Sequence, residues 1–418
     1  MPSRLAIAVA GGLAVSLALA ACSGEPMPVP TPSASATPSG DGVLRIGTLF
    51  PVTGSASYLG SGQAAGVEVA VREINEAGGV RGAPVEVFHR DSGDISTGTA
   101  EASFAELEAK KVDVVIGPSS SALAERLFAT TAAAKVPMIT PAATSVRLSE
   151  LGSSGYLYRT VPSAAMQGAA LAKLIDGGDK PKVALISLRD DNGTALRASL
   201  GAAVREAGGA LVADQAFTAE TKDVTPIVDA VKAAAPDGVV LAAPFSAMAQ
   251  NTAIIAALTA AGYGGAKLWL TGDAMADYSQ ALPAGTVKDV NGLLAGVDAG
   301  ADFMARVKAA DPSVTGILYA AEAYDATILA ALAATVAGDD GGPSIAGELR
   351  AVSARGIKCT AYAECLSVLK TRSDIDYDGL TGAIAFDSHG DPSPAHYGLY
   401  RYDAGNRFVR VGTTTVAR

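Results

Sequence analysis

Residues 112–149 read VDVVIGPSSSALAERLFATTAAAKVPMITPAATSVRLS, and this stretch decides the fold. Its first apolar run, residues 112–116, predicts a buried parallel strand, which a Gly-Pro pair ends. An amphipathic helical pattern follows, and a second apolar run at residues 136–139 predicts a neighbouring strand. That strand also ends in a loop of small residues, 140–145. Two adjacent strands with such loops indicate an open α/β sheet with its ligand site beyond the strand ends.

The two loops predict an anion site without basic side chains. Free backbone N–H groups and the dipole at the helix start favour an anion, and the hydroxyls of Ser121 and Thr144 add donors. Neither loop contains Lys or Arg, so a compact, weakly charged group such as a carboxylate fits best. The alternative is that serines at a helix start only cap the helix. The candidate residues in these loops are Ser120, Ser121, Ala142, Ala143 and Thr144.

The alternation of strands and helices predicts two doubly wound parallel-sheet lobes. Strand and helix patterns repeat from residue 43 and begin again after residue 163. The run at residues 291–297 is expected to return the chain to the first lobe, and the C-terminal strands to join the second. The expected bounds are 43–162 with 293–373 for the first lobe, and 163–292 with 374–418 for the second. Several short hinges between such lobes permit closure around a ligand.

The N-terminal segment predicts export and a lipid anchor. Residues 1–21 combine a positive start, a short apolar run and a small-residue site, which is typical of a signal peptide. Leu-Ala-Ala-Cys resembles a bacterial lipobox, which implies lipidation of Cys22; an ordinary cleaved signal peptide is the alternative. Residues 22–42 are rich in Pro, Ser and Thr and predict a flexible linker. The expected location is extracytoplasmic, on the cell membrane.

Charge and cysteine usage exclude several classes of partner and site. The net charge of −10 argues against binding to nucleic acid and against attachment to a membrane surface through a polybasic segment. Cys359 and Cys365 form an even pair in an exported chain, which predicts a disulfide. No metal site and no cofactor are expected, because metal-ligand spacing is missing. An enzyme is not expected either, because no base or nucleophile motif accompanies the serines.

Four segments of the chain resemble one family. The motifs LRIGTLFPVTGSASYLGSGQAAGVEVAVREINEAGG, VVIGPSSSALAE, VPMITPAATS and YLYRTVPSAAMQG are similar to leucine/isoleucine/valine-binding proteins of ABC importers, over about residues 43–411. The resemblance implies a type I periplasmic-binding fold. It also implies that Ser121, Ala142 and Thr144 hold the carboxylate and ammonium of an amino acid, and that Tyr58 covers the ligand.

Further candidate contacts come from the rest of the chain. Asn192 stands where relatives often carry an aromatic residue, which predicts a more polar wall. Phe245 could line the pocket or pack in the core. Asp273 could face the ligand ammonium or serve as a turn residue. Tyr324 could touch the ligand or pack within its helix.

The sequence therefore predicts a monomeric substrate-binding lipoprotein. It would capture a branched-chain amino acid or similar small carboxylate for the permease subunits of an ABC importer. A ligand-sensing receptor subunit is one alternative. A binding protein for amides, urea-like solutes or aromatic acids is another.

Overall fold

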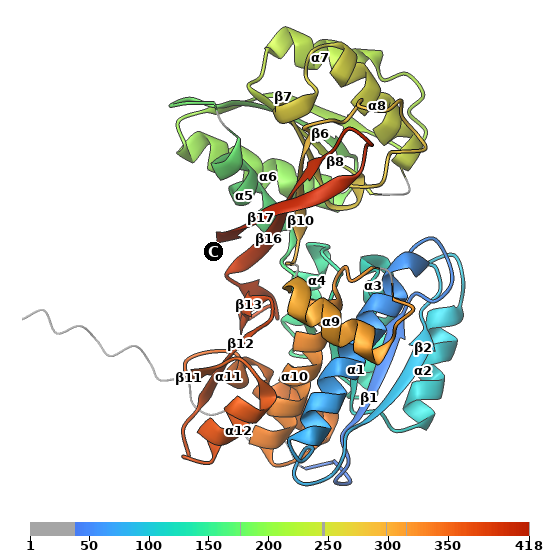
Figure 1. Ribbon diagram of the computed structural model, residues 1–418, viewed down its shortest axis with the longest axis vertical. Coiled ribbons are helices and arrows are strands. Elements are labelled where there is room, and N and C mark those ends of the chain that lie inside the picture. The colour runs from blue at the N-terminus through green and yellow to red at the C-terminus, as the bar shows by residue number, and fades with distance from the viewer. Residues whose placement is uncertain (1–37, 176, 245–246, 298, 315, 418) are drawn as a thin grey trace, which may run out of the picture. The chain divides into compact units, whose positions relative to one another are not determined.

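The computed structural model describes residues 38–417, except 176, 245–246, 298 and 315 (Figure 1). The expected signal peptide, the lipidation site Cys22 and most of the linker lie outside the described residues. The first lobe is built on a five-stranded parallel sheet in the order β2-β1-β3-β4-β5. Its strands are β1 (Arg45–Phe50), β2 (Glu86–Asp91), β3 (Val114–Ile116), β4 (Met138–Thr140) and β5 (Leu157–Arg159).

Helices cover both faces of this sheet because all its strands except the edge strand β2 are buried on both sides. Along β3, Val114 and Ile116 face one core and Val115 faces the other. The first core receives helices α1 (Gly60–Glu76), α9 (Gly300–Ala310), α10 (Ala320–Ala337), α11 (Gly342–Val352) and α12 (Tyr362–Leu369). The second core receives α2 (Thr99–Ala109), α3 (Ser121–Ala133) and α4 (Arg147–Gly152). A fully parallel sheet requires such two-sided cover.

Helix α10 is the central helix of the first lobe. It is long and apolar enough to span a membrane by composition alone, but 83% of it is buried inside the protein, as in a core helix. It packs alongside α1, where Gly62 and Gly66 allow close backbone contact with Gly316 and Ala320 (Figure 1).

The second lobe is built on a seven-stranded mixed sheet in the order β17-β16-β10-β9-β8-β6-β7. The strands are β6 (Lys182–Leu188), β7 (Ala210–Phe217), β8 (Gly238–Ala242), β9 (Leu268–Thr271), β10 (Asn291–Ala295), β16 (Ala395–Tyr402) and β17 (Phe408–Val416). Helices α5 (Gln167–Leu174) and α6 (Asp191–Glu206) pack on one face. Helices α7 (Thr225–Ala234) and α8 (Met248–Ala260) pack on the other.

Two segments differ from the expected division into lobes. Strand β10 does not return to the first lobe, because it pairs with β9 on one side and β16 on the other, inside the second sheet. Residues 374–418 are shared between the lobes. Strand β12 (Ile375–Gly379) pairs with β11 (Ile357–Cys359) beside the first lobe, whereas β16 and β17 join the second sheet. Short strands β13 (Gly382–Ala383), β14 (Ala385–Phe386) and β15 (Pro392–Ser393) lie between them.

A disulfide joins Cys359 at the end of β11 to Cys365 in α12, with Cα atoms 5.2 Å apart. Both cysteines are buried in the first core of the lobe. The bond therefore ties a short strand to the helix that follows it.

The start of α10 fixes all three crossings between the lobes. The hydroxyl of Thr160, after β5, donates to the Glu322 carbonyl at 2.8 Å. The Val297 N–H, after β10, donates to Glu322 Oε1 at 2.8 Å. The N–H and hydroxyl of Thr381, before β16, donate to Asp325 Oδ2 at 2.9 and 2.7 Å. Glu322 and Asp325, three residues apart in α10, thus bind all three segments that connect the lobes.

Candidate functional site

The start of α3 carries the first two predicted residues. Ser120 is the N-cap, and its hydroxyl oxygen accepts the Leu123 N–H at 3.4 Å. Ser121 is the first helical residue, and its oxygen accepts the Ser145 N–H at 3.1 Å. Because Ser121 serves there as an acceptor, its O–H proton is still available for an additional acceptor. Ser120 is thus a capping residue, and Ser121 links α3 to the neighbouring loop.

The loop after β4 is held from behind by its carbonyl groups. The carbonyls of Ala143 and Ser145 accept from Arg159 Nη1 at 3.4 and 2.8 Å. The Thr144 carbonyl between them accepts the Ala164 N–H at 2.9 Å. The Ala143 N–H donates to the Thr140 hydroxyl at 3.2 Å. The backbone of the predicted ligand loop is therefore fixed at each of these residues.

Thr144 is half-buried, and its donors are unused within the described part of the chain. Neither its N–H nor its hydroxyl makes a hydrogen bond to a described residue. Donors that have no partner within the protein bond to water or to a ligand, so these two donors are available to a bound solute. Ala142 is half-buried beside it, whereas the Ala143 methyl packs in the core.

Asn192 approaches the same loop from the second lobe. It lies in the first turn of α6, which Asp190 caps by accepting the Gly193 N–H at 2.7 Å. Asn192 Oδ1 accepts the Val146 N–H at 3.3 Å. The structure therefore brings Ser121, Thr144 and Asn192 to one loop, from both lobes.

An exposed arginine at this place was not among the predicted residues. Arg147, the first residue of α4, bonds Glu125 of α3 at 3.2 Å and Asp191 of α6 at 3.3 Å. Glu125 also accepts from the Ser145 hydroxyl at 3.0 Å. Nothing in the local sequence distinguishes Arg147 from an ordinary surface charge, since its two partners come from distant segments.

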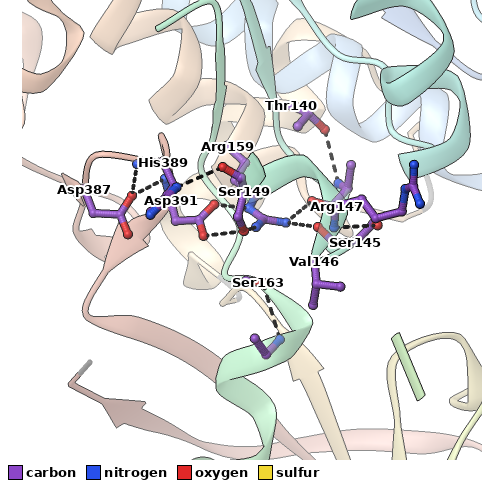
Figure 2. A network of polar contacts seen from close by, with 12 residues as sticks. Thr140, Ser145, Val146, Arg147, Ser149, Arg159, Ser163, Asp387, His389 and Asp391 are labelled. Carbon is purple, nitrogen blue, oxygen red and sulfur yellow. Dashed lines mark hydrogen bonds and ion pairs between the residues drawn. The ribbon is translucent and has the colours of Figure 1, made fainter. Parts of the chain in front are cut away.

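A buried ion pair behind the loop was also missed (Figure 2). Arg159 is 2% exposed, and its Nε donates to Asp391 Oδ1 at 2.6 Å. The hydroxyl of Ser149 accepts from Arg159 Nη2 at 2.6 Å and donates to Asp391 Oδ2 at 2.8 Å. The Arg159 guanidinium thus lies behind the uncharged loop, and the Asp391 carboxylate neutralises its charge.

The remaining predicted residues come from other segments of the chain or lie outside the described residues. Tyr58 lies in the short helix η1 (Ser57–Leu59) with 57% of its surface exposed. Asp273 follows β9 in the short helix η5 (Gly272–Ala274). Phe245 lies outside the described residues.

Tyr324 is a core residue and not a wall of this site. It is 2% exposed in α10, and its hydroxyl donates to Glu73 Oε2 at 2.6 Å. Burial, together with the adjacent Glu73 carboxylate, raises the pKa of this phenol. Phe303 packs edge-on against its ring. Of the two alternatives for Tyr324, the structure therefore supports helix packing over a ligand contact.

A small cavity adjoins the Arg159 network. Its volume is about 50 Å³, and its lining includes Ser149, Ser163 and Asp391. Solute pockets are usually several hundred Å³, so this cavity has room for water only. Within the described ranges, no group of three or more His, Cys, Asp or Glu side chains could hold a metal ion.

Comparison with known proteins places this geometry in a family. A sequence profile described as periplasmic binding protein matches residues 43–392. The chain is 25% identical to the chemotactic signal transduction system substrate-binding protein BasB of Halobacterium salinarum, over 86% of this chain and 87% of that protein. It is 30% identical to the leucine-, isoleucine-, valine-, threonine- and alanine-binding protein of Pseudomonas aeruginosa. That match spans 46% of this chain and about half, 51%, of the relative.

Solved structures share the fold. The branched-chain amino acid transporter substrate-binding protein LivJ of Streptococcus pneumoniae, in complex with isoleucine, aligns with a TM-score of 0.66 and 20% identity, over 90% of this chain and 100% of that one. A solute-binding protein of an ABC transporter from R. palustris, in complex with 4-hydroxybenzoate, aligns with a TM-score of 0.66 and 18% identity, over 90% and 98% of the chains. This chain belongs to the periplasmic binding protein family and has the type I periplasmic-binding fold of the leucine/isoleucine/valine-binding proteins.

Proposed function

We propose that this protein is the substrate-binding component of an ABC importer and captures a small solute that carries a carboxylate. A branched-chain amino acid is the first candidate. The observation that supports the proposal is the meeting of Ser121, Thr144 and Asn192 at one loop, with the Thr144 N–H and hydroxyl unused among the described residues.

Neutral donors supply the chemistry of capture. A carboxylate beside Thr144 would accept from its N–H and hydroxyl, from the Ser121 O–H and from the free N–H groups that begin α3. Hydrogen bonds to a charged acceptor are about twice as strong as neutral ones, so several together can replace a basic side chain. Asp273 would hold an ammonium group and Tyr58 would cover the ligand.

The carboxylate is the group that the known ligands of the similar structures share. LivJ is described with isoleucine and the R. palustris protein with 4-hydroxybenzoate, and both ligands carry a carboxylate. The rest of the two ligands differs, so the wall of the second lobe would set the choice. Asn192 makes that wall polar, which keeps amides, urea-like solutes and aromatic acids among the candidates.

Export and anchoring by the N-terminal segment belong to the same proposal. Residues 1–21 would be a signal peptide and Cys22 the lipidated residue, with the permease subunits as partners and a monomer as the solution state. The end of the linker is bound to the first lobe: the N–H groups of residues 39–42 donate to Asp339 and Asp340 at 3.0–3.2 Å. Membrane fractionation of the full chain against Cys22→Ser tests the anchor, which requires the variant to be released.

A sensor is the second candidate, because one relative is described as part of a chemotactic signal transduction system. The binding step would be the same and the partner would differ. Uptake of radiolabelled ligand by cells with and without the gene separates the two roles. Import requires uptake to fall in the deletion strain, whereas sensing leaves uptake unchanged.

The binding site is tested with Thr144→Val, which keeps the shape and removes one hydroxyl. Isothermal titration with amino acids, aromatic acids and small amides first identifies the ligand of the wild-type protein. We expect its Kd to rise about tenfold or more in Thr144→Val, because a charged ligand loses a hydrogen bond worth about 1.5–3 kcal/mol. Thr130→Val, at an exposed position of α3, is the control and should bind normally. Affinity within twofold of wild type in Thr144→Val would remove this residue from the site.

A further inference from the structure

Arg159 lies where the chain leaves the first lobe. It is the last residue of β5, and the first crossing to the second lobe begins directly after it. Its guanidinium donates from all three nitrogens, and its side chain is almost fully buried (Figure 2). A fully buried cation costs free energy unless every charge and donor is matched, so a residue of this kind serves a specific arrangement.

On one side, Arg159 controls the orientation of the proposed ligand loop. Its Nη1 donates to the carbonyls of Ala143 and Ser145, the residues on either side of Thr144. With both flanking carbonyls drawn toward the guanidinium, the peptide planes around Thr144 are set. The Thr144 N–H and hydroxyl are then left for a ligand, although Arg159 itself does not reach them.

On the other side, Arg159 holds the segment that leads into the third crossing. Its Nε pairs with Asp391, and its backbone N–H donates to the Gly390 carbonyl at 3.0 Å. Asp387 Oδ1 closes this turn by accepting the N–H groups of His389 and Asp391 at 2.7 and 3.1 Å (Figure 2). The turn is thus a defined unit that precedes β15 and β16.

We propose that Arg159 is a positioning residue that couples the ligand loop, residues 142–146, to the hinge turn, residues 387–391, through Ser149 and Asp391. A ligand that tightens the loop would tighten the hinge turn through the same guanidinium. Lysine cannot replace it, since the contacts require a planar group with donors in several directions. The ligand part of this inference rests on the proposed function; the coupling of the two segments does not.

Hydrogen exchange of the ligand-free protein tests the coupling. Arg159→Lys and Ser149→Ala are compared with Arg350→Lys. The Arg350 guanidinium donates to the Ser388 carbonyl at 2.6 Å and makes no hydrogen bond to the ligand loop among the described residues. We expect amide exchange to rise at least tenfold in both segments in Arg159→Lys and several-fold in Ser149→Ala. In Arg350→Lys the rise should be confined to the hinge turn. Exchange that rises in only one segment in Ser149→Ala overturns the coupling, even where Arg159→Lys fails to fold.

Ligand binding tests the positioning role with the solute identified for the wild-type protein. Ser149→Ala should raise the Kd about three- to tenfold, and the ligand should still protect the loop but no longer the hinge turn. Unchanged affinity with retained protection of the hinge turn overturns the inference and leaves the proposed function intact. A wild-type protein that binds no solute of the panel defeats the proposed function, whereas the exchange comparison still decides the coupling.

Discussion

Asp113 is a half-buried carboxylate that forms no ion pair within the described part of the chain. It directly precedes β3, and its Oδ2 accepts the Arg45 N–H at 2.8 Å. Burial raises its pKa to about 7, and the neighbouring Asp340 and Asp41 carboxylates add to the shift, against the Arg45 N–H and charge. The folded protein therefore binds a proton at Asp113 more tightly than the unfolded chain does.

This shift predicts how stability depends on pH. Between the model-peptide value of 3.8 and about 7, the folded state holds a proton that the unfolded state has lost, so stability falls as pH rises through that range. Asp113→Asn keeps the acceptor for Arg45 and cannot ionise. We expect it to raise the free energy of unfolding by on the order of 1 kcal/mol at pH 8 and to have little effect near pH 4. Urea unfolding at both pH values measures this, with Asp229→Asn in an exposed pair as control. Equal stability of Asp113→Asn and wild type at pH 8 would contradict it.

The placement of small polar residues at the ends of apolar strands could be predicted, and their role in ligand binding stays a prediction. Ser121 and Thr144 follow apolar strands in small-residue loops, and the structure links the two loops through the Ser121–Ser145 bond. Arg159 and Arg147 could not be predicted, because their partners Asp391 and Asp191 lie 232 and 44 residues away. The sequence left both ligand contact and helix packing open for Tyr324, because its partner Glu73 lies on another helix.

Helices α1 and α10 form the closest helix contact of the first lobe, and glycine makes it possible. A Cβ at Gly66 would lie 2.2 Å from the Ala320 carbonyl oxygen, and one at Gly62 would lie 2.3 Å from the Gly316 oxygen. Both obstacles are backbone atoms, which cannot rotate away. The packing of α10, the helix that binds the three connecting segments, therefore depends on glycine at positions 62 and 66.

Replacing Gly66 by Ala should separate the two helices. We expect a loss of about 2–3 kcal/mol in the free energy of unfolding, as for overpacked cores, measured by urea denaturation. The control is Gly347→Ala in α11, where a Cβ would meet nothing within 4 Å. That change should stabilise by up to about 1 kcal/mol through helix propensity. Gly66→Ala as stable as wild type would show that the helices can shift without cost.

Local periodicity predicts most strands and helices of the fold, but it does not predict the sheet to which each strand belongs. The patterns that begin again after residue 163 predict alternating strands and helices, and β6 to β9 with the helices between them follow that order. The run that forms β10 is expected from the sequence to return the chain to the first lobe. Its place between β9 and β16 depends on pairing with a segment about 100 residues later. The same reason explains why β12 pairs beside the first lobe while β16 joins the second.

Contacts between the lobes gather at the proposed ligand loop. Val146 and Arg147 of the first lobe meet Asn192 and Asp191 at the start of α6. The proposed ligand donors and the interlobe contacts thus share one short segment. Capture by closure requires this arrangement, since a ligand that bridges the lobes and the contacts between them would then stabilise the same state.

The Arg147–Asp191 ion pair joins the two lobes, and its removal is predicted to weaken ligand binding. Asp191→Asn keeps the side-chain shape and removes the attraction to Arg147, so the state in which the lobes meet loses a small amount of free energy. The pair is exposed, with 59% and 63% of the side chains accessible, so we expect only a two- to fourfold rise in ligand Kd at low salt. The difference should vanish near 0.5 M salt, where the Debye length falls to about 4–5 Å. Asp277→Asn is the matched control, because its exposed pair with Arg407, at 3.2 Å, lies within the second lobe. Ligand titrations of both variants at low and high salt measure this effect. If the loss of affinity persists at high salt, or if Asp277→Asn shows it too, Asp191 acts within the second lobe and not through its contact with the first lobe.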